Sequence, residues 1–176
     1  MKFKLPKINL VTAVLTAVAV LFTMPTLSKE FVTAATQKQV TVNYNKQVEC
    51  LAKNIYYEAA SEPYEGKLAV AQVTLNRADN PKFPKDVCKV VTQKNVIMEK
   101  VVCQFSWYCD GKPQKVPNDE AYRDSYAVAK KVLLEGFRLD SLNDALYYHA
   151  VYINPGWQLP IVTRIGNHIF YRSSKI

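Results

Sequence analysis

The segment Lys67–Leu75, with the sequence KLAVAQVTL, constrains the fold most strongly because its apolar side chains would cover nearly every side of a helix. A helix that is apolar all round is buried, so other elements must surround this one. Pro63 before it and Pro81 after it predict a helix from about Tyr64 to Ala78. At 176 residues, the chain is long enough to build one domain around such a helix.

Other helices are predicted on both sides of this central one. Leu51, Ile55 and Ala59 recur at the spacing of one helical face, and a helix from about Gln47 ends before Pro63. Helical or capping patterns also occur at 85–92 and 118–135. The stretch 93–117 has no regular period and is predicted to be a loop.

The C-terminal part changes character and predicts extended structure. The stretches ALYYHAVYI (145–153) and IVTRIGNHIFY (161–171) are rich in aromatic and β-branched residues. Turn residues stand at Asn154-Pro155-Gly156 and at Gly166-Asn167. The expected class is therefore α+β, mainly helical, with a small β-hairpin or sheet near the C-terminus.

The N-terminal part has the form of an export signal. A basic head precedes an uncharged run from Ile8 to Ser28, which is typical of a secretory leader. The apolar run from Leu10 to Phe22 is short for a stable span of roughly 20 residues, so we expect a cleaved leader or a transient membrane anchor. We expect three parts: an export signal or anchor (1–35), a polar linker (36–46) and a domain (47–176), exported to the periplasm or the extracellular wall as a monomer.

Four cysteines fit an oxidising destination, where an even number indicates two disulfides. They are Cys50, Cys88, Cys103 and Cys109. Three pairings are open, and we favour Cys50 with Cys88 and Cys103 with Cys109, which would close a small loop.

The net charge of +8 favours an anionic polymer or surface as partner. Lys and Arg are scattered and form no basic run or stripe, so nucleic acid is not the expected partner. Solubility alone would also explain this charge.

Glu58 is the residue that most clearly suggests catalysis. It follows Ile55 by three positions and Leu51 by seven, so a helix that continues to Ala60 places its carboxyl on the apolar side. Desolvation raises the pKa of a carboxyl, and a carboxyl that is protonated near neutral pH suits general-acid catalysis on a glycosidic oxygen. The structural alternative is a helix-end carboxylate that pairs with an Arg such as Arg77.

Two nearby carboxylates have an ordinary explanation. Glu62 lies in the connecting turn and Glu65 in the first turn of the next helix, and carboxylates are favoured at a helix N-terminus. We therefore interpret both as capping groups, although either would also fit the rim of a cleft.

The loop CQFSWYCD (103–110) combines aromatic and amide side chains, which suit sugar rings with their apolar C–H faces and hydroxyl rims. The alternative is that Phe105 and Trp107 anchor the loop to the core. The predicted cleft residues are Tyr57, Gln104, Ser106, Trp107, Tyr148 and His149, the last as a group that orients one of the others.

The sequence predicts no metal and no cofactor. The two histidines, His149 and His168, could form a zinc site only with a glutamate, and no HExxH or other helical ligand spacing occurs. Hydrogen-bonded structural histidines are the expected case. No GxSxG, P-loop or GxGxxG motif is present.

The chain resembles the spore-cortex-lytic type of cell-wall hydrolases, a family with exported bacterial and phage members. The resemblance covers about residues 46–172 and depends on five stretches in the family's order: NIYYEAASEPYEGKLAVAQVTLNR (54–77), FPKDVCKVV (83–91), CQFSWYCDG (103–111), ALYYHAVYINPGW (145–157) and IGNHIFY (165–171). Two departures stand out. Ala60-Ser61 replaces the family's Arg-Gly in EARGEP, and KNVIMEKVV (94–102) makes a longer link before the QFSW loop.

The resemblance implies a lysozyme-like, mainly helical fold and cleavage of peptidoglycan between N-acetylmuramic acid and N-acetylglucosamine, with Glu58 as the catalytic acid. We expect a lytic transglycosylase, in phage lysis, wall remodelling or spore germination. A hydrolytic muramidase would need a second carboxylate, for which Glu62, Glu65 and Asp110 are candidates. The sequence also leaves open a non-catalytic wall-binding envelope protein and a zinc amidase.

Overall fold

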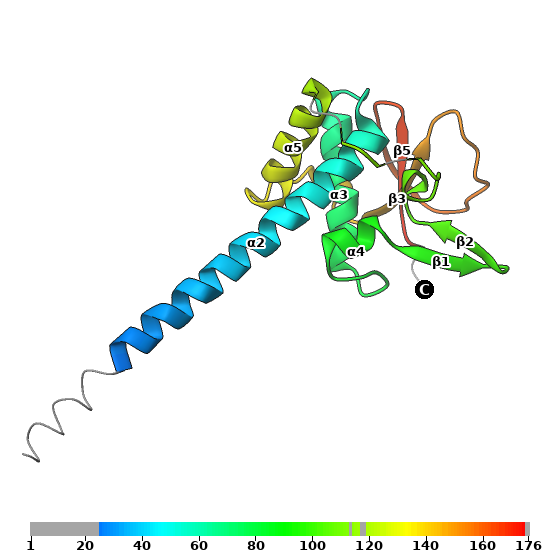
Figure 1. Ribbon diagram of the computed structural model, residues 1–176. Coiled ribbons are helices and arrows are strands. Elements are labelled where there is room, and N and C mark those ends of the chain that lie inside the picture. The colour runs from blue at the N-terminus through cyan, green and yellow to red at the C-terminus, as the bar shows by residue number, and fades with distance from the viewer. Residues whose placement is uncertain (1–24, 113, 117–118, 175–176) are drawn as a thin grey trace, which may run out of the picture. The chain divides into compact units, whose positions relative to one another are not determined.

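The computed structural model describes residues 25–112, 114–116 and 119–174 and divides the chain into two units, 1–43 and 44–176 (Figure 1). Residues 1–24 of the predicted export segment lie outside the described residues. None of the described helices combines the length and apolar character needed to cross a bilayer.

Helix α2 (Pro25–Ala59) includes the stretch 36–46, which is predicted from its polar sequence to be a linker without helical periodicity. The structure corrects this prediction, because the stretch is helical. In this stretch, the described side chains at 36–41 and 43–46 are exposed. A helix that packs against nothing needs no apolar face, so the sequence lacks the helical periodicity that would have predicted it. The second unit begins at Tyr44, and Val48 is the first buried residue among the described side chains of α2.

Helix α3 (Tyr64–Asp79) is the buried centre of the second unit, as the sequence predicts. Every residue from Gly66 to Leu75 is buried. Leu68, Ala71 and Leu75 pack into one apolar cluster with α2, and Ala69 and Val73 pack into a second cluster against the C-terminal sheet. A largely apolar surface suits this position because α3 has core on both sides.

Two polar side chains on α3 bind the chain that leads into the C-terminal sheet. Gln72 exchanges hydrogen bonds with the backbone of Leu139, at 3.0 and 2.6 Å. The Asn76 amide donates to the carbonyls of Leu142 and Ala145, at 2.7 and 2.9 Å. These side chains satisfy backbone polar groups at 139–145 and fix this segment to α3.

Helices α4 and α5 lie where the sequence predicts helices, whereas the two short helices η1 and η2 were not predicted. Helix α4 (Val87–Val91) is shorter than the predicted 85–92. Helix α5 (Glu120–Leu133) begins after Asp119, whose side chain accepts a hydrogen bond from the Tyr122 amide at 2.8 Å. The short helices η1 (Ser106–Tyr108) and η2 (Asp140–Leu142) complete the helical part.

The C-terminal sheet confirms the predicted α+β class. Strands β3 (Ala145–Ala150), β4 (Ile161–Ile165) and β5 (His168–Arg172) form an antiparallel sheet in the order β3-β5-β4. The turn between β4 and β5 is Gly166-Asn167, with Gly166 at a φ of +55°.

A second, two-stranded sheet was not predicted. Strands β1 (Lys94–Ile97) and β2 (Lys100–Cys103) form a hairpin within the stretch that is predicted to be a loop. Met98 and Glu99 make its turn at φ values of 48° and 64°, a conformation usually marked by Asn-Gly. The prediction was wrong because the turn lacks that signal and the exposed strands show no apolar alternation.

Both disulfides are formed, in the favoured pairing. Cys50–Cys88 joins α2 to α4, with the Cα atoms 5.2 Å apart. Cys103–Cys109 joins the end of β2 to the residue after η1, with the Cα atoms 5.9 Å apart. The second bridge therefore holds the base of the β1–β2 hairpin against the QFSW loop.

Candidate active site

A cleft of about 410 Å³ lies where the end of α2, the helix α3, the β1–β2 hairpin and strand β3 converge. The loop after β3 adds one further wall. The lining residues are Glu58, Arg77, Asn95, Ile97, Val102, Cys103, Gln104, Phe105, Ser106, Tyr147, Tyr148 and Trp157.

Glu58 lies in the last turn of α2 and reaches this cleft from the apolar side of the helix. The Tyr148 hydroxyl donates a hydrogen bond to its Oε2 atom at 3.0 Å. Burial raises the pKa of Glu58, while the Tyr148 hydrogen bond and the charge of Arg77 oppose this rise. Burial is the largest of these effects, so the protonated form of Glu58 is more favoured than that of an ordinary, solvent-exposed glutamate.

Arg77 supplies a buried positive charge beside the carboxyl. Its side chain is 3% exposed, and its Nε donates to the Leu146 carbonyl at 2.8 Å. The guanidinium carbon lies 5.0 Å from the centre of the Phe105 ring and 5.9 Å from that of Tyr148. Leu146 is the extra residue where the β3–β5 register shifts, so a bulge offers its carbonyl to Arg77.

Glu58 and Arg77 do not form the ion pair that was the structural alternative for Glu58. Among the described residues, no ion pair within 4.0 Å includes Glu58. Arg77 acts at longer range, and burial lowers the pKa of its own guanidinium. Burial also raises the pKa of Tyr148 well above its ordinary value, which keeps its phenol as a hydrogen-bond donor to Glu58.

The structure places four of the predicted site residues on one cleft: Glu58, Gln104, Ser106 and Tyr148. The other three lie elsewhere. Tyr57 and Trp107 line a separate pocket of about 360 Å³ and stack with ring centres 4.5 Å apart. His149 contacts the Ala150 carbonyl and the Tyr171 hydroxyl, at 2.9 and 2.7 Å, and its ring also meets the edge of Trp157.

Trp107 is held mainly by the core. Its side chain is 8% exposed and belongs to the apolar cluster of α2 and α3. Its indole N–H donates to the buried Asn54 at 3.0 Å, and the Asn54 amide donates to Thr74 at 3.1 Å. This position matches the second interpretation of the loop, in which Trp107 anchors it to the core.

Sequence reasoning missed part of the cleft wall. Trp157 follows the turn Asn154-Pro155-Gly156 and remains 43% exposed, although it lines the cleft. A Trp directly after a turn was the available signal, because Trp is large and rarely fully buried. Asn95, Ile97 and Val102 were missed because the hairpin that carries them was not predicted.

Glu62 has a structural role away from the cleft. It is 8% exposed and accepts hydrogen bonds from the backbone and side-chain amides of Asn167, at 2.9 and 3.1 Å. His168 lies 3.9 Å from the same carboxylate. A side chain at Gly166 would collide with Glu62, so the β4–β5 turn is built around this carboxylate.

Replacing Glu62 with Ala should therefore lower the free energy of unfolding by about 2 kcal/mol, because two hydrogen bonds to a charged acceptor are lost. Urea denaturation measures this change. Glu65→Ala is the control, since Glu65 is exposed and should stay within about 0.5 kcal/mol of the wild type. Equal effects of the two replacements would contradict the assigned role of Glu62.

The other acidic candidates also lie off the cleft. Asp110 lines the pocket that contains Tyr57 and Trp107, and Glu65 is exposed on α3. Glu58 is thus the single carboxylate among the described residues that line the cleft. In the part of the chain that the structure describes, no group of three or more His, Cys, Asp or Glu side chains is placed to hold a metal ion.

Comparison of the sequence with known families identifies the family of this α+β domain. Residues 61–171 match the model of the Cell Wall Hydrolase family, and the chain belongs to that family. This confirms the resemblance seen in the sequence. The matched range begins three residues after Glu58 and does not include it.

Two curated relatives are named spore cortex-lytic enzyme. The protein from Bacillus subtilis is 34% identical over 134 residues, which make up 72% of this chain and 37% of the relative. The protein from Oceanobacillus iheyensis is 32% identical over 131 residues, or 70% of this chain and 40% of the relative. The chain thus spans well under half the length of these relatives.

Two solved structures share the fold. The catalytic domain of the Bacillus cereus SleB protein matches with a TM-score of 0.55 and 28% identity, covering 73% of this chain and 91% of that domain. The catalytic domain of the germination-specific lytic transglycosylase SleB from Bacillus anthracis matches with a TM-score of 0.53 and 29% identity, covering 72% and 93%. The similarity therefore extends over almost all of each catalytic domain.

Proposed function

We propose that this chain is a peptidoglycan lytic transglycosylase that cleaves the bond between N-acetylmuramic acid and N-acetylglucosamine. The observation that carries the proposal is that Glu58 is the single carboxylate among the described residues lining the cleft. Hydrolysis by the usual routes needs two carboxylates on opposite sides of the bond. Transglycosylation needs one, and a relative with this fold is named a lytic transglycosylase.

In the proposed mechanism, protonated Glu58 gives its proton to the bridging oxygen as the bond from the muramic acid C1 breaks. Glu58 is then a carboxylate, and it takes the proton of the muramic acid C6 hydroxyl while that oxygen bonds to C1. Water is not consumed, and Glu58 returns to its protonated form. Burial favours the acid at the start, while Tyr148 and Arg77 stabilise the carboxylate between the steps.

The remaining cleft residues fit the binding of sugar. Gln104 and Ser106 bring hydrogen-bonding groups to the same cleft as Glu58, and Tyr148 fixes the orientation of the carboxyl. Tyr57, Trp107 and His149 do not line the cleft, and we propose that they help to position the residues that do. The proposed setting is outside the cytoplasm, in phage lysis or wall remodelling, with peptidoglycan strands as the partner.

The masses of the reaction products test this proposal. Digestion of purified peptidoglycan by the full-length protein should leave 1,6-anhydromuramic ends, which are lighter than reducing ends by one water. Reducing ends would instead indicate a hydrolytic muramidase. Released stem peptides with intact glycan would indicate an amidase, and an undigested wall would indicate a binding protein.

Replacing Tyr148 with Phe should raise the pKa of Glu58 further. The Tyr148 hydrogen bond stabilises the carboxylate form of Glu58, and the variant lacks this bond. The first step needs protonated Glu58, so activity falls as the pH rises through this pKa. The alkaline limb of the pH profile of wall lysis should therefore move to higher pH in Tyr148→Phe. Tyr152→Phe changes an 83% exposed side chain and is the control. A limb that stays in place or moves to lower pH would contradict the role of Tyr148.

A further inference from the structure

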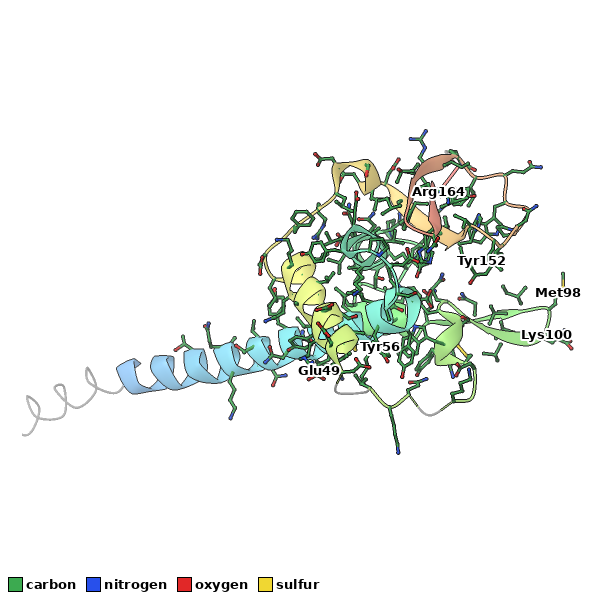
Figure 2. All side chains as sticks on the ribbon, turned by 90° about the horizontal axis from the view of Figure 1, so that it is seen from above. Glu49, Tyr56, Met98, Lys100, Tyr152 and Arg164 are labelled. Carbon is green, nitrogen blue, oxygen red and sulfur yellow. A yellow bond between two sulfur atoms is a disulfide. The ribbon has the colours of Figure 1, made fainter. Side chains whose placement is uncertain are left out.

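The β1–β2 hairpin exposes an unusual amount of apolar surface. Its aliphatic side chains are 44% to 91% exposed, and they are Val96, Ile97, Met98, Val101 and Val102. Exposed apolar groups that are adjacent to one another usually mark a binding surface. Figure 2 shows Met98 and Lys100 at the outer end of the hairpin, away from the body of the domain.

The strand register assigns these side chains to two faces of the hairpin. Asn95 pairs with Val102 and Ile97 pairs with Lys100, so these four side chains share one face. Asn95, Ile97 and Val102 all line the cleft that contains Glu58. Val96 pairs with Val101 on the opposite face, and neither lines the cleft.

We infer that the cleft face of the hairpin, formed by Asn95, Ile97 and Val102, is a binding wall for the glycan strand on which Glu58 acts. This inference rests on the proposed function and assigns substrate contacts to residues beyond its catalytic centre. Ile97 and Val102 offer apolar contact to the C–H faces of the sugar rings and to the methyl groups of their N-acetyl substituents. Asn95 offers an amide to their polar groups.

The base of the hairpin is fixed to the QFSW loop, so this wall is held in place. The Gln104 amide donates to the Gln93 carbonyl at 2.9 Å, which extends the ladder beyond the two strands. The disulfide Cys103–Cys109 ties β2 to the segment after η1. The Lys94 ammonium lies 5.3 Å from the centre of the Tyr108 ring.

Trp157 gives the cleft a second exposed apolar wall. Its ring is 43% exposed and meets the edge of Tyr147, with ring centres 6.1 Å apart, and both residues line the cleft. Figure 1 shows the loop 151–160 and the hairpin projecting on the same side of the second unit. A polymer is a suitable occupant, because the surface continues past the carboxyl to the exposed Ile97 and Trp157.

The test compares paired threonine substitutions on the two faces of one hairpin. The full-length protein carries Glu58→Gln, so that strands are bound without being cut, and the probe is glycan strands freed of peptides by an amidase. Ile97→Thr with Val102→Thr should raise the dissociation constant by about tenfold, because hydroxyls replace the Ile97 ethyl group and a Val102 methyl group in apolar contacts. Val96→Thr with Val101→Thr, on the outer face, should change it by less than about twofold. Calorimetric titration measures both values.

Threonine keeps the β-branched shape that strands favour, so both pairs should fold, which circular dichroism checks. Unchanged affinity in the cleft-face pair, or equal losses in both pairs, would overturn the inference. Sedimentation with phosphatidylglycerol vesicles tests whether the hairpin binds a lipid surface instead. The inference would also be overturned if the outer-face substitutions abolished vesicle binding while the cleft-face substitutions left glycan affinity unchanged. Lysis by otherwise unmodified Glu58→Gln tests the proposed function separately, since affinity does not depend on the chemistry of Glu58.

Discussion

Replacing Glu58 with Gln should reduce the rate of wall lysis by about a thousandfold, within the range that general acid catalysis contributes. The amide keeps the shape of the carboxyl, and its oxygen can still accept the Tyr148 hydrogen bond. It cannot give a proton to the bridging oxygen or take one from the C6 hydroxyl. Both steps of the proposed mechanism therefore fail, while the fold remains.

Glu65→Gln is the matched control for this loss, because it makes the same chemical change at an exposed carboxylate seven residues away. Its lysis rate should equal that of the wild type. A Glu58→Gln variant that lyses walls within a few-fold of the wild-type rate would contradict the assignment of Glu58 as the catalytic acid.

The same substitution should change how stability depends on pH. Burial raises the pKa of Glu58 in the folded chain above its ordinary 4.5, so the folded state binds this proton more tightly than the unfolded state. The wild type therefore loses stability as the pH rises from the ordinary pKa through the folded one, whereas Glu58→Gln has no such proton to lose. Urea denaturation across this range should show the variant gaining stability relative to the wild type as pH rises.

The two tryptophans should respond to truncation in opposite ways. Trp107→Ala should lower the free energy of unfolding by about 3 to 5 kcal/mol, because it leaves a cavity in the core and removes the partner of Asn54. Trp157→Ala removes a 43% exposed ring and should change stability by less than about 1 kcal/mol, while weakening the binding of glycan strands.

Urea denaturation and glycan binding, measured on both variants, separate these roles. If Trp107→Ala weakened glycan binding strongly while leaving stability near that of the wild type, Trp107 would be a substrate contact, as the sequence predicts. If Trp157→Ala bound glycan normally, the cleft wall assigned to Trp157 would be wrong.

Local spacing predicted the features that depend on one helix at a time. The apolar run of α3 indicated a buried helix because burial on all sides leaves no polar face. The distances from Leu51 and Ile55 to Glu58 placed the carboxyl on the apolar side of α2, where it lies. Both arguments needed only the helical period.

Features that depend on contacts distant in sequence were missed or ambiguous. From the sequence, Arg77 was considered only as an ion-pair partner. Its hydrogen bond to the Leu146 carbonyl depends on a strand bulge, which no local sequence pattern predicts. The QFSW loop offered several aromatic and polar groups without showing which would face inward. In the structure Ser106 lines the cleft, while Trp107 lies in the core, where its indole N–H donates a hydrogen bond to Asn54.

In the proposed mechanism, one carboxyl, Glu58, cleaves the glycan without consuming water. Digestion of purified peptidoglycan in water labelled with heavy oxygen, followed by mass analysis of the new ends, tests it most directly. We expect the wild type to produce anhydromuramic ends that carry no heavy oxygen, and Glu58→Gln to produce almost no new ends. New reducing ends with heavy oxygen at C1 would contradict it, because they would show that water attacks the sugar.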